Sequence, residues 1–163
     1  MKRLLCLVLA GLGLLPLCAC GRQGTGEGLT NMNIPAGDVT EFYYTYENIN
    51  YGAFYQRYHF RAEDGKIIFR HETRERPHGY GPTTEQDVTA SGTAELTEAQ
   101  WAEVLALLKD GSVSRRTDGA DSGSAGPWTY IYWKGDRDLY RKYEFPGYAE
   151  MRAFEDYCAA LAG

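Results

Sequence analysis

Cysteine and histidine are typical zinc ligands, and cysteine is also a strong nucleophile; the sequence has four cysteines and three histidines. A zinc site needs three or four ligands that converge at close spacing. His59 and His71 fall on predicted strands at positions that face opposite sides of a sheet, and His78 falls in the loop after them. The sequence has no Gly-x-Ser-x-Gly nucleophile motif, phosphate-binding glycine loop or EF-hand loop. It therefore predicts no metal and no cofactor, and it indicates no enzymatic activity.

The first twenty residues have the layout of a secretory signal peptide. Lys2 and Arg3 give a positive start, and an apolar run covers residues 4–17. That run is shorter than the roughly 20 apolar residues of a membrane span. The residues that close it, Leu17-Cys18-Ala19-Cys20, resemble the lipobox of bacterial lipoproteins, which has an aliphatic residue, two small residues and an obligatory cysteine. The resemblance implies diacylglycerol on the Cys20 sulfur, cleavage before Cys20, and a lipoprotein whose acyl chains, such as palmitate, hold it at the extracytoplasmic face of the cell membrane.

Cys20 is the predicted lipid acceptor because Cys18 follows the bulky Leu17. Residues 1–19 are then the signal peptide, and Cys158 is the one cysteine left with a free thiol. A reactive thiol needs an electropositive, partly exposed site, whereas Glu155 and Asp156 lie close by in the sequence. We therefore predict that Cys158 is a buried, inert thiol and that the mature chain has no disulfide.

The predicted mature chain is acidic. Loss of Lys2 and Arg3 leaves 15 basic and 22 acidic residues, a formal net charge of −7. Binding to nucleic acid requires a basic surface for the phosphates, so nucleic acid is excluded as a partner. Anionic lipid headgroups are excluded on the same ground, which leaves the lipid on Cys20 as the predicted contact with the membrane.

Composition divides the mature chain into a linker and one domain. Residues 20–37 contain the lipidated cysteine and a Gly-, Thr- and Asn-rich stretch without periodicity, which predicts a flexible linker. Residues 38–163 have the length of a single compact domain.

Four strands are predicted at the start of this domain, over residues 39–47, 53–62, 66–74 and 87–96. Glu63-Asp64-Gly65 is a hairpin signal between the second and the third. A two-residue Asp64-Gly65 turn puts Phe60 opposite Phe69 and Arg57 opposite Glu72. In that register one face of the hairpin is aromatic and apolar while the other is charged, which supports the pairing.

The second half of the domain holds two predicted helices and a second hairpin. Thr97-Glu98-Ala99-Gln100 matches a capping box, and the helix that follows is predicted to end in a left-handed cap at Asp110-Gly111. Residues 112–126 are polar and rich in Gly and Ser, which predicts a loop. The last helix is predicted to begin at Tyr148, after Pro146-Gly147, and to run to the end.

The second hairpin, residues 128–133 and 139–145, has two registers that the sequence leaves open. A two-residue Gly135-Asp136 turn pairs Tyr132 with Leu139, whereas a three-residue loop moves the partners by one. Aromatic residues occupy both faces of residues 128–133, so alternation does not choose between them.

These elements predict an α+β fold. Their order is β-β-β-β-α-β-β-α, and the short turns favour an antiparallel sheet with both amphipathic helices packed on one face. Gly92 weakens the fourth strand, which predicts an edge position for it.

Aromatic residues are the most unusual feature of the composition, with 13 Tyr, 6 Phe and 3 Trp. Tyrosine forms strands well and packs its ring while its hydroxyl stays wet, so a purely structural role explains much of this. The functional alternative is a sheet face that stacks on a sugar, a peptide or a protein. Trp128, Tyr130 and Trp133 are the candidate ligand-binding residues in that case.

The chain as a whole resembles a group of small lipoproteins of Gram-positive, often gut-associated, bacteria. The resemblance rests on Leu17-Cys18-Ala19-Cys20, the helix over residues 96–108, Gly126-Pro127-Trp128 leading into Lys134-Gly135-Asp136, and Pro146 before the last helix. It implies the location and a small α+β domain, and it assigns no functional residue beyond Cys20.

Three functional hypotheses follow. The leading one is a non-catalytic, surface-tethered domain that binds a peptide, a glycan or another envelope protein. The second is an inhibitor or accessory protein of an envelope protein, acting through residues 112–126. The third is a hydrolase acting on cell-wall material, which would need acids clustered in one cleft or a Cys158–histidine pair.

Overall fold

The computed structural model describes residues 28–115, 127–136 and 141–163. These residues form one antiparallel sheet with the strand order β4-β3-β2-β1-β6-β7-β5. The strands are β1 (Val39–Asn48), β2 (Ala53–Glu63), β3 (Lys66–Arg76), β4 (Val88–Leu96), β5 (Ser112–Arg115), β6 (Trp128–Trp133) and β7 (Arg141–Glu144). The helices are α1 (Glu98–Leu108) and α2 (Tyr148–Ala162), and two short 3-10 turns are η1 (Ala36–Asp38) and η2 (Glu85–Asp87).

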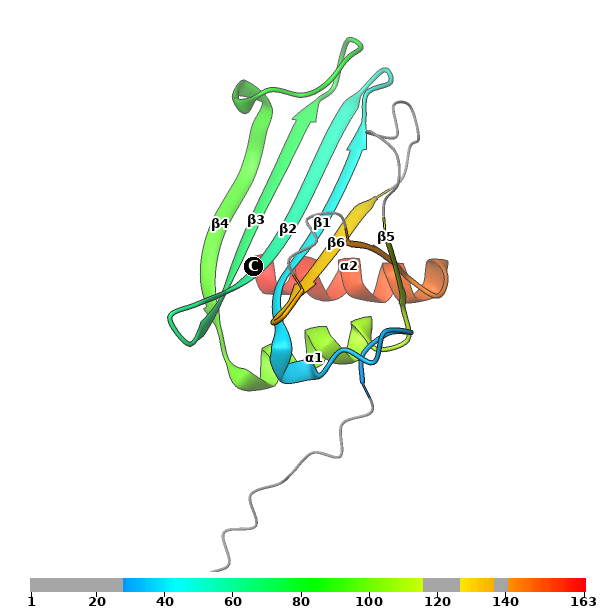
Figure 1. Cartoon of the computed structure of the whole chain (residues 1–163). Helices are drawn as coiled ribbons and strands as arrows, with labels where there is room; N and C mark the ends of the chain where they lie inside the picture. Colours follow the sequence, from blue (N-terminus) through cyan, green and yellow to red (C-terminus); the bar gives the residue numbers. More distant parts are fainter. Residues whose placement is uncertain (1–27, 116–126, 137–140) are drawn as a thin grey trace, which may run out of the picture.

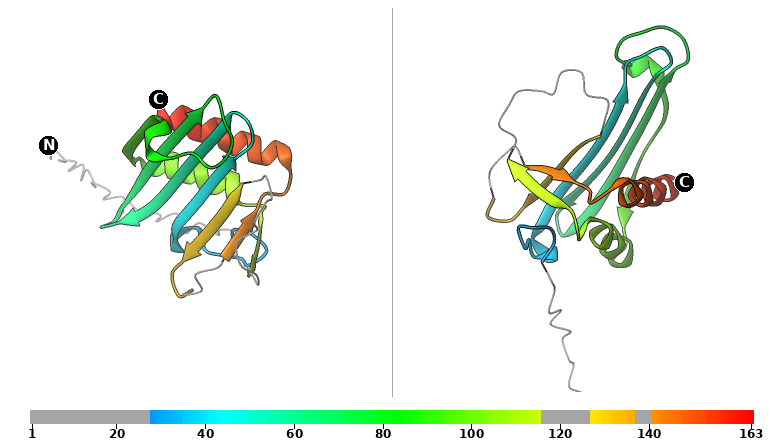
Figure 2. Two further views of the ribbon diagram at one scale, coloured as in Figure 1. Left: turned by 90° about the horizontal axis from the view of Figure 1, so that it is seen from above. Right: turned by 90° about the vertical axis from the view of Figure 1, so that its right-hand side faces the viewer.

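The predicted α+β class is confirmed, and both helices lie on one face of the sheet (Figure 2). The predicted element order is wrong in one place. Ser112–Arg115, which the sequence assigns to a loop, forms β5 and pairs with β7, so three strands and not two separate the helices. The rest of that predicted loop, residues 116–126, lies outside the described residues.

The β2–β3 hairpin has the predicted register. Phe60 pairs with Phe69 and Arg57 with Glu72. Asp64 and Gly65 have φ angles of 51° and 80°, which is the left-handed pair that a two-residue type I′ turn requires. β4 lies at the edge of the sheet, as the glycine at position 92 predicts.

The β6–β7 hairpin resolves the register that the sequence leaves open. Tyr130 pairs with Lys142, which is the register of the longer loop and not that of the two-residue turn. The residues at the tip, 137–140, lie outside the described part of the chain.

The start of α1 is as predicted, but its end is not. Thr97 Oγ1 accepts from the Gln100 amide while Gln100 Oε1 accepts from the Thr97 amide, so the capping box is complete. At the other end Lys109 is right-handed and Gly111 is not among the residues with positive φ. Position 111 is glycine for a different reason, because a Cβ there would lie 2.2 Å from the Tyr143 ring.

The core fills the space between the sheet and the helices. Phe154 of α2 is fully buried and contacts the rings of Phe42, Tyr44 and Phe60. Cys158 is also fully buried, and burial raises the pKa of its thiol well above the ordinary value. The thiol is therefore protonated and inert, as its sequence neighbours predict.

Part of the predicted linker belongs to the folded domain. Leu29 and Ile34 form an antiparallel bridge and are buried in the core. The Thr30 amide donates to the Lys109 carbonyl after α1. Residues 28–37 therefore pack against the domain, because these two aliphatic side chains outweigh the polar composition around them.

Candidate functional site

The structure separates the three aromatic residues that the sequence proposes for ligand binding. Trp128 and Tyr130 pair with Thr45 and Tyr43 on the face of the sheet away from the helices, the open face. Trp133 packs against the core instead. The three residues therefore do not form one binding platform.

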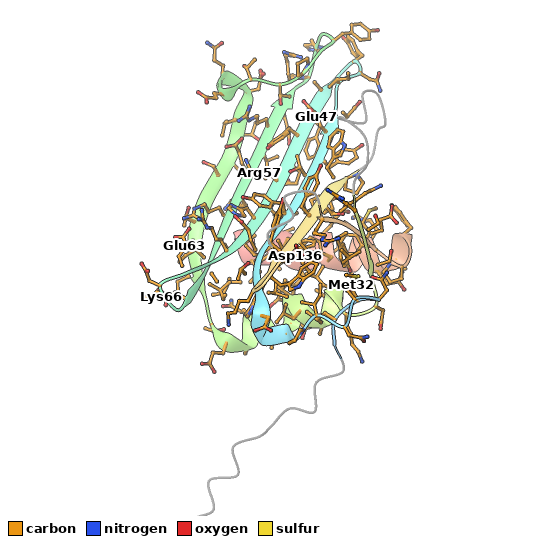
Figure 3. All side chains as sticks on the ribbon, viewed as in Figure 1. Met32, Glu47, Arg57, Glu63, Lys66 and Asp136 are labelled. Atoms are coloured by element: carbon orange, nitrogen blue, oxygen red, sulfur yellow. The ribbon has the colours of Figure 1, made fainter. Side chains whose placement is uncertain are left out.

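On the open face, aromatic rings of the strands already contact neighbouring side chains of the sheet. His59 stacks on Tyr43 with the ring centroids 4.1 Å apart, and the Arg57 guanidinium lies 5.2 Å from the Tyr43 centroid. Arg74 lies 5.0 Å from the centroid of Tyr55 in the same way. Figure 3 shows Arg57 on this face, with the helices behind the sheet. Because cation–π and stacking contacts already use these rings, they are poor platforms for a ligand.

Glu41 joins the polar groups of the open face. Its Oε1 atom accepts from the Tyr43 hydroxyl at 2.6 Å and lies 2.7 Å from His59 Nε2. Burial and the bond to Glu41 raise the pKa of Tyr43 to about 12. Burial lowers the pKa of His59 although the hydrogen bond to Glu41 opposes this, so the ring is neutral at pH 7. The cluster is a satisfied structural network.

A groove lies on the other side of the sheet, where α2 meets β1 and β2. Strands β1–β4 continue past α2 toward the β1–β2 turn, so the helices leave this part of the helix-side face uncovered (Figure 1). The groove encloses about 480 Å³. That size lies within the range of small-molecule and cofactor sites.

The groove is lined by side chains from strands β1 and β2 and by side chains from helix α2. From the strands come alternate residues that share one face, namely Tyr44, Tyr46, Phe54, Gln56 and Tyr58. From α2 comes a stripe beside the one that packs on the core, namely Tyr148, Met151, Arg152, Glu155, Asp156 and Ala159. The groove thus has aromatic rings on its sheet side and charged groups on its helix side.

The polar groups of the groove form a chain along α2. The Tyr44 hydroxyl donates to Glu155 Oε1, and Arg152 pairs with Glu155 Oε2. Arg152 Nη2 also donates to Asp156 Oδ1 at 3.2 Å. Burial and the bond to Glu155 raise the pKa of Tyr44 far above its usual range, so this hydroxyl stays a donor. Asp156 is the outermost group, with 71% of its side chain exposed.

Tyr148 extends the site. It is 74% exposed at the start of α2, although it lines the groove. A second hollow of about 480 Å³ adjoins the first and shares Pro127, Tyr148 and Met151 with it. The two hollows therefore adjoin each other, and the exposed Tyr148 lines both.

The three histidines do not converge. His59 is on the open face, His71 lies beside Gly92 of β4, and His78 bonds Tyr51 at the far end of the sheet. Within residues 28–115, 127–136 and 141–163, no three His, Cys, Asp or Glu side chains are grouped to hold a metal ion. The predicted lipid acceptor, Cys20, lies outside these ranges.

No protein-family model, no curated protein and no solved structure matches this chain. None of the described helices has the length and apolar character needed to cross a bilayer.

Sequence reasoning missed the groove because it depends on where α2 lies relative to β1 and β2. One signal was present. Tyr148, Arg152, Glu155 and Ala159 recur at helical spacing, offset from the apolar stripe of the same helix. A tyrosine within a charged stripe is the feature that distinguishes this helix face from an ordinary solvated one.

Proposed function

We propose that the protein is a lipid-anchored, extracytoplasmic binding domain whose groove between α2 and strands β1 and β2 takes a segment of a glycan chain. The observation that carries the proposal is the pair of adjoining hollows that exposed Tyr148 lines on both sides. The N-terminal sequence supports lipid on Cys20 and a position at the extracytoplasmic face of the membrane.

The chemistry of the groove suits a sugar. A pyranose ring has apolar C–H faces and a rim of hydroxyl groups, so it stacks on an aromatic side chain while its rim needs hydrogen bonds. Tyr46, Phe54 and Tyr148 supply rings, while Arg152 and Asp156 supply planar donors and acceptors. Two connected hollows suit a chain of sugars better than a single compact ligand.

The arrangement of acids supports binding over hydrolysis. Glycoside hydrolysis uses two carboxyl groups that face each other across the scissile bond. Glu155 and Asp156 are the carboxylates lining the groove, and they follow one another on a single helix, whereas Glu144 of the second hollow pairs with Lys142 at 2.9 Å. Both pair with Arg152, which favours a role as fixed hydrogen-bond acceptors.

Calorimetric titration of the purified whole chain in detergent micelles with an N-acetylglucosamine tetrasaccharide tests the proposal. We expect saturable binding that Tyr148→Ala weakens about tenfold, the scale of losing one aromatic contact at a binding site. Tyr80→Ala is the matched control, because Tyr80 is 77% exposed but lies in the loop between β3 and β4. No binding by the wild type, or equal effects of the two variants, would contradict a glycan site in the groove.

A peptide is the competing ligand, and a second titration separates the two. A short peptide with proline and lysine residues could place its proline rings on the tyrosines and its charge near Asp156. If this peptide binds in a Tyr148-dependent manner and the tetrasaccharide does not, the glycan assignment is wrong and the groove is a peptide site.

A further inference from the structure

The outer edge of β4 presents an unprotected pairing surface. β4 is the terminal strand of the sheet and is nine residues long, whereas the opposite edge strand, β5, has four residues. No described element pairs with the outer side of β4, which is visible at the left of the sheet in Figure 1. Such an edge carries a row of backbone amides and carbonyls that can pair with another strand.

The side chains of β4 do not block such pairing. Proteins usually protect long edges with lysine, proline or inward charges. Val88–Leu96 has the sequence VTASGTAEL, with no proline, no basic residue and one acid. That acid, Glu95, is already paired with Lys66 of β3 at 2.7 Å. The middle of the strand therefore offers small, uncharged side chains on both of its faces.

Gly92 keeps the middle of the edge small for a structural reason. A Cβ at this position would lie 2.5 Å from His71 Nε2 of the neighbouring strand. Pairing between β3 and β4 is regular from Leu96 to Ala90 and shifts between Thr73 and Arg74, opposite the start of β4. The stretch with regular pairing thus contains the glycine, and the irregularity is confined to the start of β4.

We propose that β4 pairs antiparallel with β4 of a second copy of this chain, about a two-fold axis at Gly92. Antiparallel pairing of identical edges is self-complementary, and it continues the sheet across both copies with all helices on the same side. This inference is independent of the glycan site, because the groove lies against β1 and β2.

The side chains at this register are complementary. The axis at Gly92 pairs Ser91 with Thr93 and Ala90 with Ala94 of the second copy, within the stretch of β4 whose pairing with β3 is regular. Cross-strand pairs of this kind stabilise a sheet when no like charges oppose each other. The single acid of β4, Glu95, lies outside these pairs, so the two Glu95 side chains lie at opposite ends of the interface.

Cysteine pairs test the register on the whole chain extracted in mild detergent. Differently tagged Ser91→Cys and Thr93→Cys chains are produced together and oxidised with copper–phenanthroline, and the products are separated without reductant. The proposed pairing places positions 91 and 93 of different copies opposite each other, within the reach of a disulfide. We expect a mixed disulfide dimer between the two tags. No dimer, or as much dimer from either variant alone, would overturn the proposal.

A charge series tests the interaction without covalent trapping. Ser91 and Thr93 are exposed in the single chain, so substitution there preserves the fold. In S91K/T93K, lysines of the two copies oppose each other twice, and we expect the dissociation constant from sedimentation equilibrium to rise about tenfold. A mixture with S91E/T93E should form a heterodimer. A wild type that is monomeric throughout, or variants that associate like the wild type, would overturn the proposal.

Discussion

Single residues fix the packing between β7 and the end of α1, and Gly111 is the sharpest case. The Tyr143 hydroxyl donates to the Leu108 carbonyl at 3.0 Å, so the ring cannot move away from position 111. A Cβ there would lie 2.2 Å from the ring. We expect Gly111→Ala to lower the free energy of unfolding by about 2 kcal/mol or more, the cost of overpacking a rigid site.

Urea denaturation measures this effect, with Gly37→Ala as the control. An added Cβ at Gly37 meets nothing within 4 Å, and its φ angle is not in the left-handed region. The control should therefore unfold like the wild type. Equal denaturation midpoints for the wild type and Gly111→Ala would show that the ring of Tyr143 is not held as described.

His59 makes stability depend on pH. Burial lowers the pKa of the folded-state ring, while the unfolded chain has the ordinary value of 6.5. Below that value the unfolded state binds a proton that the folded state does not, so stability falls as the pH decreases from 6.5 toward the folded-state pKa. The slope cannot exceed about 1.4 kcal/mol per pH unit for one proton.

The contribution of His59 is isolated by comparison with His59→Gln, in which the amide can still donate to Glu41. Urea midpoints are measured for both proteins between about pH 7.5 and about pH 5. We expect the wild type to lose more stability than the variant over this interval. Parallel pH profiles would show that the histidine is not the group responsible.

At the scale of elements, the start of α1 depends on one side chain. Thr97 Oγ1 satisfies the Gln100 amide, one of the four amides at the start of a helix without an intrahelical partner. We expect Thr97→Ala to lower the free energy of unfolding by about 1 kcal/mol, and Thr97→Ser to restore most of it. Thermal unfolding followed by circular dichroism tests both, and a serine variant as unstable as the alanine variant would contradict the capping role.

Local signals explain what could be predicted at this scale. The β2–β3 register follows from the Asp64-Gly65 turn and from alternation on either side of it, all within a short stretch of chain. The capping box likewise lies within four residues. β5 gave no such signal, because Ser112–Arg115 has one apolar residue and gains its strand conformation from β7, which lies far along the sequence.

The candidate site could not be predicted from local sequence patterns, because its two sides come from distant parts of the chain. Its sheet side comes from Tyr46 and Phe54, and its helix side comes from residues after Tyr148. The aromatic excess correctly pointed to the strands, but it did not show which face the helices leave open or that Arg57 and His59 already use the Tyr43 ring. Those contacts exist only once β1 and β2 pair.

At the scale of the molecule, the proposed anchor, groove and β4 edge have a consistent arrangement. The described chain begins near α1, at the end of the sheet away from the β1–β2 turn (Figure 1). Pairing through β4 would put two grooves on the same side of one continuous sheet. A chain-like ligand that reaches both would then bind more tightly than either groove alone allows, because the second contact is intramolecular.

The anchor itself is the feature on which the extracytoplasmic assignment depends, and two neighbouring cysteines allow a matched test. Each buried methylene of an acyl chain contributes about 0.8 kcal/mol, so diacylglycerol with a further acyl chain holds a protein firmly at a bilayer. If Cys20 is the acceptor, Cys20→Ala should abolish incorporation of a metabolic palmitate label and move the chain out of the membrane fraction. Cys18→Ala changes a residue two positions away and leaves a small side chain before the acceptor, so it should keep both the label and the membrane fraction. If the label were retained in Cys20→Ala and lost in Cys18→Ala, the lipid acceptor would be Cys18. If neither the variants nor the wild type took up the label, the protein would not be lipid-anchored, and that part of the proposed function would be wrong.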